Sequence, residues 1–334
     1  MKHMNKQLIT HILESLAVGD AYGKSTEFAS RLQIQDAFDS VDTLLTPSES
    51  LKHTDMRHAQ VTDDTEINFF LLEDYCSANE VTAEIAAKSL LRWYRETPEP
   101  LKYIGPSSLA AIKAIEANEP LEETGKKGTS CGGIMRAPAP FLLSSSLEEL
   151  REYIIATLTP SHNTPLALEA AMGYGYALHK MGETKDMGQI IAAAIEGSKY
   201  GRTHHTEGLD DICAPSCAHR IQYLAKEIER FDDSNALLDF LFYIYGTTIS
   251  SCDVFVASFA LFLWAKDDVF LAIKLATMLG GDTDTIACLA AILCCAYAGE
   301  HNLPRDIVSE VKAANKLDFD GLTQCIINYK RNRP

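Results

Sequence analysis

Positive charge is scarce in this sequence. It contains 30 Lys and Arg residues against 46 Asp and Glu, which gives a formal net charge of −16 at pH 7. Nucleic-acid-binding proteins neutralise phosphates with clustered Lys and Arg, and the densest basic stretch here is only Lys330, Arg331 and Arg333. We therefore expect no nucleic-acid partner. A small anionic ligand stays open, because a metal cation or a helix N-terminus can supply local positive potential.

Long apolar runs and a secretory leader are also lacking. The runs at 254–264 and 286–298 are shorter than the ~18 residues that a membrane-spanning helix needs, and no charged segment followed by an apolar one opens the chain. We expect no membrane partner. Cysteines number nine, an odd count, and Cys288, Cys294 and Cys295 lie in an apolar run. Reduced, buried thiols in a cytoplasmic protein fit this usage best.

Strand signals are few, and helical spacing dominates. No segment alternates cleanly between apolar and polar residues, whereas apolar residues recur at intervals of three and four. This periodicity predicts helices at residues 8–18, 66–77, 83–94, 107–117, 147–157, 165–180, 187–198, 216–230, 235–245, 253–264, 268–278, 283–298, 304–315 and 319–328. The sequence shows neither a low-complexity linker nor a repeat period. We expect an all-α fold, with one compact orthogonal helical domain at 1–334.

Two short acidic clusters precede apolar helices. Residues 62–65 read TDDT, and residues 280–285 read GGDTDT. Side chains one or two positions apart do not share a helix face, so these carboxylates spread around the helix entrance. The helix dipole favours their ionised form there, and hard oxygen ligands are what Mg²⁺ or Mn²⁺ prefers. Together the two entrances predict a binuclear metal site with shared carboxylates.

Helix capping is the alternative explanation for these clusters. Asp and Thr are favoured N-cap residues, but one cap side chain per helix is enough, and each cluster has two carboxylates plus threonines. Three more segments support a functional site. They are GDAYG at 19–23, followed by Glu27; the glycine-rich SCGGIMR at 130–136, whose backbone N–H groups could bind a diphosphate; and SHN at 161–163 before Pro165.

The ordered set GDAYG, TDDT, CGGIMRAP, SHN with TP, and GGDTDT resembles the ADP-ribosylglycohydrolase family. The resemblance runs from about residue 8 to about residue 299. It implies an all-α hydrolase with two divalent cations, Mg²⁺ or Mn²⁺, that releases ADP-ribose from an ADP-ribosylated protein, most often from arginine. It also implies the metal ligands Thr62, Asp63, Asp64, Asp282, Asp284 and Thr285.

The same resemblance implies roles for other residues. Asp282 would take a proton from the attacking water, with Asp63 as a second catalytic acid. Glu27 lies on a loop that closes over the site in some members, where it would shield the reaction or contact the leaving group. The ADP-ribose would be bound by a diphosphate loop and a histidine, namely Cys131, Gly132, Gly133, Ile134, Met135 and His162. Residues 246–253 would line the adenosine pocket.

The chain departs from the family pattern at two places. Many members have Gly-Asn-Gly in the phosphate loop, where this sequence has Ser130, Cys131 and Gly132. Some have a second histidine at the position of Thr164. Because the metal ligands are intact, we expect the differences to affect the contacts with phosphate and ribose, and with them the leaving group.

Three alternatives stand beside the hydrolase interpretation. One is an antitoxin or immunity-type protein that blocks an ADP-ribosyltransferase by docking, with hydrolysis secondary. Another is an unrelated dimetal hydrolase of phosphate esters, which would not need the segments at 19–23 and 161–165. The third concerns a local zinc site of Cys213, Cys217, His219, His204 and His205. Three residues separate its two cysteines and no second pair follows, unlike typical structural zinc sites, so buried thiols are the better interpretation.

Overall fold

The computed structural model describes residues 4–203, 208–209 and 212–333, and every regular element among them is a helix. Within these residues the recorded pairing of extended backbone is an isolated antiparallel bridge between Ser130 and Ser250. The predicted all-α class is therefore confirmed. None of the helices described is both long enough and apolar enough to cross a membrane.

The α-helices of the described part follow one another along the whole chain. They are α1 (Lys6–Gly23), α2 (Arg31–Ala37), α3 (Asp63–Ala78), α4 (Ala83–Glu96), α5 (Pro106–Glu116), α6 (Leu121–Thr124), α7 (Pro138–Leu143), α8 (Leu147–His162), α9 (Pro165–Met181), α10 (Met187–Thr203), α11 (Cys217–Glu227), α12 (Ser234–Phe240), α13 (Ser251–Ala265), α14 (Val269–Leu279), α15 (Thr283–Ala298), α16 (Arg305–Asn315) and α17 (Phe319–Arg331). Short 3₁₀ turns occur at Pro100–Lys102, Ile134–Arg136 and Ile228–Arg230, and a π-helical turn at Leu241–Tyr245.

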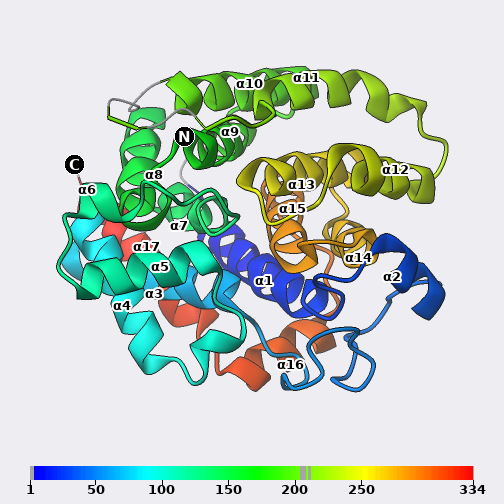
Figure 1. Ribbon diagram of the computed structural model, residues 1–334, viewed down its shortest axis with the longest axis horizontal. Coiled ribbons are helices and arrows are strands. Elements are labelled where there is room, and N and C mark those ends of the chain that lie inside the picture. The colour runs from blue at the N-terminus through cyan, green and yellow to red at the C-terminus, as the bar shows by residue number, and fades with distance from the viewer. Residues whose placement is uncertain (1–3, 204–207, 210–211, 334) are drawn as a thin grey trace.

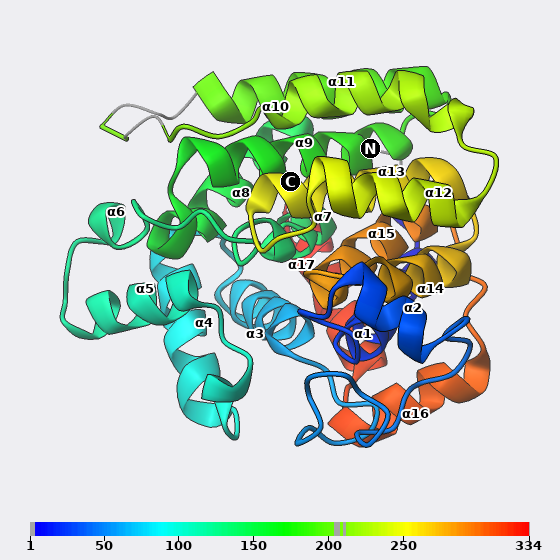
Figure 2. The ribbon, with the colours of Figure 1, turned by 45° about the vertical axis from the view of Figure 1, so that its right-hand side comes forward.

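Helix α15 lies at the centre of the fold. Every residue of α15 except Tyr297 and Ala298 is buried, as expected for a helix that is apolar all round. It packs against α1, α13 and α14, and Figures 1 and 2 show these helices in the interior, with α10 and α11 forming an outer layer beyond α9.

Helices α1 and α15 run antiparallel at unusually close range. A Cβ on Gly19 would lie 2.9 Å from the backbone of Ala287, and one on Gly23 would lie 2.3 Å from the carbonyl oxygen of Thr283. Glycine at both positions therefore allows the two backbones to meet. This contact brings the end of α1 against the beginning of α15.

Most predicted helices match the structure to within a few residues, and the differences have local causes. Helix α3 begins at Asp63 rather than at residue 66, so its acids lie in the first helical turn. Helix α2 was missed because seven mostly polar residues show no clear period. Helix α7 is not among the predicted helices because its six residues, PAPFLL, are too few to show a period, although proline suits the first turn of a helix.

Candidate functional site

The entrance of α15 is fixed by its main chain. Gly280 and Gly281 have φ angles of +91° and +86°, a region that residues with side chains rarely adopt. The carbonyl of Gly281 accepts a hydrogen bond of 2.7 Å from the Phe28 N–H, and the Asp282 N–H donates to the Thr247 carbonyl at 2.9 Å. The backbone of Asp282 is thus held in place without help from its side chain.

Capping does not account for the acids at these entrances. Asp282 occupies the N-cap position of α15, yet its side chain makes no capping hydrogen bond. At α3 the cap is Thr62, whose hydroxyl accepts from the Asp64 N–H. One carboxylate oxygen of Asp64 and one of Asp282 are buried with no hydrogen-bond partner. Buried polar atoms are normally paired, so these two oxygens are suited to bind a cation or to accept from a ligand.

Asp20, the acid of the GDAYG segment, anchors the entrance of α3. Its carboxylate accepts from the Thr62 N–H at 2.9 Å and hydroxyl at 2.9 Å, and from the Thr65 N–H at 3.1 Å and hydroxyl at 2.6 Å. Burial raises the pKa of Asp20 to about 6, although the threonine hydrogen bonds oppose that rise. The sequence drew attention to this segment, but only the structure shows that Asp20 is a support rather than an open ligand.

The two acidic entrances open onto one cavity. Asp63, Asp64, Asp282 and Asp284 line it together with Glu27. Carboxylate oxygens of Glu27, Asp282 and Asp284 all lie within 4.8 Å of one another. In addition, the hydroxyl oxygen of Thr285 lies 3.3 Å from Asp64 and 3.2 Å from Asp282, so one side chain connects the α3 and α15 entrances.

The charge balance of this cavity fits a divalent cation. Burial, and after it the negative charge of Asp284, hold the pKa of Asp63, Asp64, Asp282 and Glu27 well above the ordinary range. A cation would compensate both effects at once, and it would give the unpaired carboxylate oxygens a partner. Clustered carboxylates and a hydroxyl are hard donors, which suit Mg²⁺ or Mn²⁺.

The remaining predicted residues divide into two groups. Four of them line the cavity, namely Cys131, Gly132, Met135 and Thr285. Four others are not among its lining residues: Thr62, Gly133, Ile134 and His162. His162 is fully buried, with its Nε2 3.0 Å from the Ser130 hydroxyl. A Cβ on Gly132 would lie 2.8 Å from the ring of His162. The histidine therefore supports the glycine-rich loop from behind, and its predicted direct contact with a ligand is not offered by this geometry.

Several backbone N–H groups of the glycine-rich loop are already bonded within the protein. The Cys131 N–H donates to the Ile249 carbonyl at 2.7 Å, the Met135 N–H to the Cys131 carbonyl at 2.9 Å, and the Gly133 N–H to the Ser130 carbonyl at 3.3 Å. Fewer amides than the sequence suggested are thus open to a diphosphate. Of the segment 246–253, Ile249 lines the cavity.

Several residues on the cavity wall carry no signal in the sequence. The Nε2 atom of His53 lies 2.7 Å from Oε2 of Glu27, without the alignment of a hydrogen bond. Phe28 is 55% exposed at a strained φ of +59°, and Tyr103 donates to Glu66 at 3.0 Å. None of these residues belongs to a motif, and only the tertiary packing brings them to the cavity.

The zinc site of Cys213, Cys217 and His219 does not form in the part of the chain that the structure describes. Cys213 is exposed and Cys217 is buried, and neither lies in a group with His219 that is close enough to hold a metal ion. His204 and His205 lie outside the described residues. Two such groups are found among the described side chains: Glu27 with Asp282 and Asp284, and His11 with Glu14 and His301.

The family model for ADP-ribosylglycohydrolase matches residues 5–332. The chain belongs to the ADP-ribosylglycohydrolase family. The resemblance read from its motifs is confirmed. The family acts on ADP-ribosylated substrates and generally depends on divalent metals, and the acidic cavity supplies candidate groups for such metals.

Individual relatives of this family member are distant in sequence. It is 24% identical to the uncharacterized protein YegU of Escherichia coli (strain K12), over 99% of both chains. It is also 24% identical to the ADP-ribosylarginine hydrolase Tri1 of Serratia proteamaculans (strain 568), over 88% of this chain and 72% of Tri1. A solved structure titled "ADP-ribosylglycohydrolase-related protein complex" matches 98% of each chain with a TM-score of 0.66 and 18% identity, which shows a shared fold.

Proposed function

We propose that this protein is a hydrolase, dependent on Mg²⁺ or Mn²⁺, that releases ADP-ribose from arginine side chains and so reverses mono-ADP-ribosylation. One observation carries the proposal: carboxylates from two helix entrances, far apart in the sequence, line one cavity and leave two buried oxygens unpaired. The arginine acceptor is supported by the similarity to Tri1, a protein named as an ADP-ribosylarginine hydrolase. We also propose that residues 1–334 form one domain, because α1, α3 and α15 all contribute to this site.

The proposed metal ligands come from both entrances. They are Thr62, Asp63, Asp64, Asp282, Asp284 and Thr285. Bound divalent cations would supply positive charge that orients ribose hydroxyls and lowers the pKa of water. The hydroxyl of Thr62 already donates to Asp20, so only a lone pair of this oxygen is available to a metal.

Asp282 and Glu27 are assigned the proton transfers. Asp282 accepts a proton from the water that attacks C1″ of the distal ribose. The new C1″–O bond forms as the C1″–N bond to the guanidine breaks, and the departing nitrogen takes a proton from Glu27. A carboxylate oxygen of Glu27 lies within 4.8 Å of those of Asp282 and Asp284, and His53 beside Glu27 lies on the same wall. Asp63 helps to orient the ribose.

The glycine-rich loop is assigned to the diphosphate. Cys131, Gly132 and Met135 face the cavity, and Arg136 is completely buried close behind them, where one guanidinium nitrogen donates to the Ser108 hydroxyl at 2.8 Å. A second one donates to the Ser161 hydroxyl. Because these two partners are neutral, the charge of Arg136 offsets part of the repulsion between the acidic cavity and a phosphate.

A release assay tests the acceptor and the metal together. Purified protein is incubated with ADP-ribose attached to arginine, to serine or to a nucleic-acid base, in Mg²⁺, in Mn²⁺ or in EDTA, and free ADP-ribose is quantified. We expect release from arginine in either metal and none in EDTA. Release only from another acceptor would correct the substrate, and undiminished release after complete metal removal would overturn the mechanism.

A further inference from the structure

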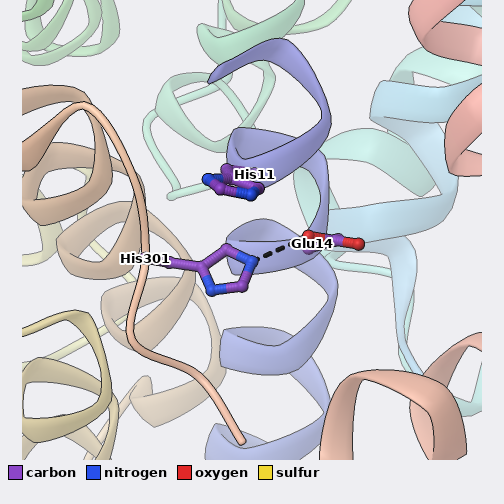
Figure 3. Close-up of side chains that lie close together, drawn as sticks. All are labelled: His11, Glu14 and His301. Atoms are coloured by element: carbon purple, nitrogen blue, oxygen red, sulfur yellow. Dashed lines mark hydrogen bonds and ion pairs between the residues drawn. The ribbon is translucent and has the colours of Figure 1, made fainter. Parts of the chain in front are cut away.

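Two histidines and a glutamate meet at the end of the α1–α15 pair that is remote from the acidic cavity. His11 and Glu14 are three residues apart on α1 and therefore share a helix face. His301 follows α15 and reaches the same place (Figure 3). One potential ligand atom from each residue lies within 4.8 Å of the other two. Nε2 of His301 is 2.7 Å from Oε2 of Glu14, and the two imidazole rings are 4.3 Å apart between centroids.

One nitrogen in this group has no partner. Nδ1 of His11 is buried and makes no hydrogen bond in the structure. A shallow surface pocket lined by His11, Glu14, Lys6, Gln7 and Thr10 lies beside it, which leaves space for water or another small ligand. An unpaired imidazole nitrogen thus lies beside a second imidazole and a carboxylate, which are donor types that bind transition metals.

We propose that His11, Glu14 and His301 bind a divalent transition-metal ion of the zinc type, separate from the metals of the acidic cavity. Two imidazoles and one carboxylate are a ligand set that suits Zn²⁺, Ni²⁺ or Co²⁺, whereas Mg²⁺ prefers oxygen ligands. The ligand types therefore predict a zinc-type ion at this site and Mg²⁺ or Mn²⁺ at the acidic cavity. The negative charge of Glu300, which also acts on His11, adds to the attraction for a cation.

Binding requires a change of tautomer at His301. Nδ1 of His301 accepts a hydrogen bond of 3.2 Å from the Leu303 N–H, which places the ring proton on Nε2, toward Glu14. When a cation binds Nε2, that proton moves to Nδ1 and the contact with Leu303 breaks. The cation then takes over the role of the proton beside Glu14.

The position of the site indicates a structural role. It joins the first half of α1 to the segment after α15, while the other ends of these two helices carry Asp20 and Asp282. A cation here would hold the two helices together at the end away from the cavity. We therefore expect the metal to stabilise the fold and to leave the chemistry of the acidic site unchanged.

Direct metal binding tests this proposal. The whole protein, kept in excess Mg²⁺, is titrated with Zn²⁺ by calorimetry and with Co²⁺ by visible absorption, and its Tm is recorded. We expect one Zn²⁺ per chain, a rise in Tm of several degrees, and a Co²⁺ spectrum without thiolate charge-transfer bands. His11→Asn and His301→Asn should each lose this equivalent, and Asp282→Asn should keep it.

His58→Asn is the matched control. Nε2 of His58 lies 2.8 Å from Glu310, so this variant also removes a histidine–glutamate pair. That pair belongs to neither of the two groups of described residues that could hold a metal ion. The variant should keep the Zn²⁺ equivalent. Circular dichroism checks that each variant is folded, and Glu14→Gln replaces any histidine variant that is not. Unchanged Zn²⁺ binding in the folded variants, or thiolate bands with Co²⁺, would overturn the site.

Discussion

The entrances of α3 and α15 have similar compositions but are built in different ways. Side chains hold the α3 entrance: Thr62 caps the helix, and Asp20 accepts hydrogen bonds from Thr62 and Thr65. The main chain holds the α15 entrance, through the bonds of Gly281 and Asp282 to neighbouring backbone. As a result, the Asp282 side chain makes no capping bond and is available for chemistry. Two clusters with similar sequences therefore differ in whether side chains or backbone hold the helix entrance.

The largest expected effect is on catalysis, at the α15 entrance. Asp282→Asn keeps the shape of the side chain but removes its charge and its capacity to accept a proton. We expect kcat/KM to fall by at least about 1,000-fold, or roughly 4 kcal/mol, with little change in the free energy of unfolding. Release assays and urea unfolding measure the two quantities.

Asp233→Asn is the control for that variant. Asp233 is an exposed N-cap whose side chain accepts from the Ala236 N–H at 2.9 Å, and asparagine also caps well. Its activity should match the wild type. Wild-type turnover by Asp282→Asn would remove the difference that we draw between the two entrances.

The next effect is on stability. At Gly281→Ala the new Cβ would lie 2.0 Å from the Thr247 carbonyl oxygen, at a φ of +86°. We expect a loss of about 3 kcal/mol in urea unfolding, from backbone strain and steric overlap. Thr62→Val, which removes the side-chain cap of α3, should lose less, about 1–2 kcal/mol.

Gly299→Ala is the control that distinguishes backbone strain from steric overlap in Gly281→Ala. Gly299 has a φ of +89°, but a Cβ there would meet no atom within 4 Å. It should therefore show only the conformational penalty, about 1 kcal/mol. Equal losses for Gly281→Ala and Gly299→Ala would show that close backbone contact does not define the α15 entrance.

A smaller effect concerns pH in the absence of metal. The folded state raises the pKa of Asp20 to about 6, and burial raises the pKa values of Asp63, Asp64 and Asp282 well above their ordinary range. Between about pH 4 and the raised pKa values of these carboxyl groups, the folded chain binds more protons than the unfolded chain. The free energy of unfolding therefore falls as pH rises. In EDTA we expect the free energy of unfolding to drop by about 2 kcal/mol between pH 5 and pH 8. Excess Mg²⁺ should abolish the drop, and a rise in EDTA would contradict the burial argument.

The smallest effect is expected in the loop that faces both entrances. In Gly132→Val the new Cβ would lie 2.8 Å from the ring of His162, so the loop must shift. We expect ADP-ribose binding to weaken about tenfold, which corresponds to ~1.4 kcal/mol. Cys131→Ser should change the affinity by less than about twofold, because a hydroxyl fits where the thiol lies. Calorimetric titration decides. If Cys131→Ser is the variant that loses affinity, side-chain recognition replaces the backbone explanation.

Local periodicity predicted the fold class and most helices because α9, α13 and α15 each present long apolar surfaces to the core. The acids of TDDT and GGDTDT were found because their number exceeds what capping requires. The role of Asp20, the burial of His162 and the approach of His53 to Glu27 depend on how separate helices pack. The same holds for His301, whose neighbours His11 and Glu14 are set by the antiparallel contact of α1 with α15. No pattern in a single segment contains that information.

The pairing of α1 with α15 also constrains how the protein is made. A ribosome that adds roughly 5–20 residues per second completes α1 on the order of tens of seconds before α15 emerges. During that interval Gly19 and Gly23 have no partner helix, and Asp20 remains hydrated. A ribosome-bound chain that ends before residue 283 should thus be cleaved within α1 by added protease, whereas the released chain should resist. Protection of α1 in the truncated chain would mean that another segment temporarily covers it during synthesis.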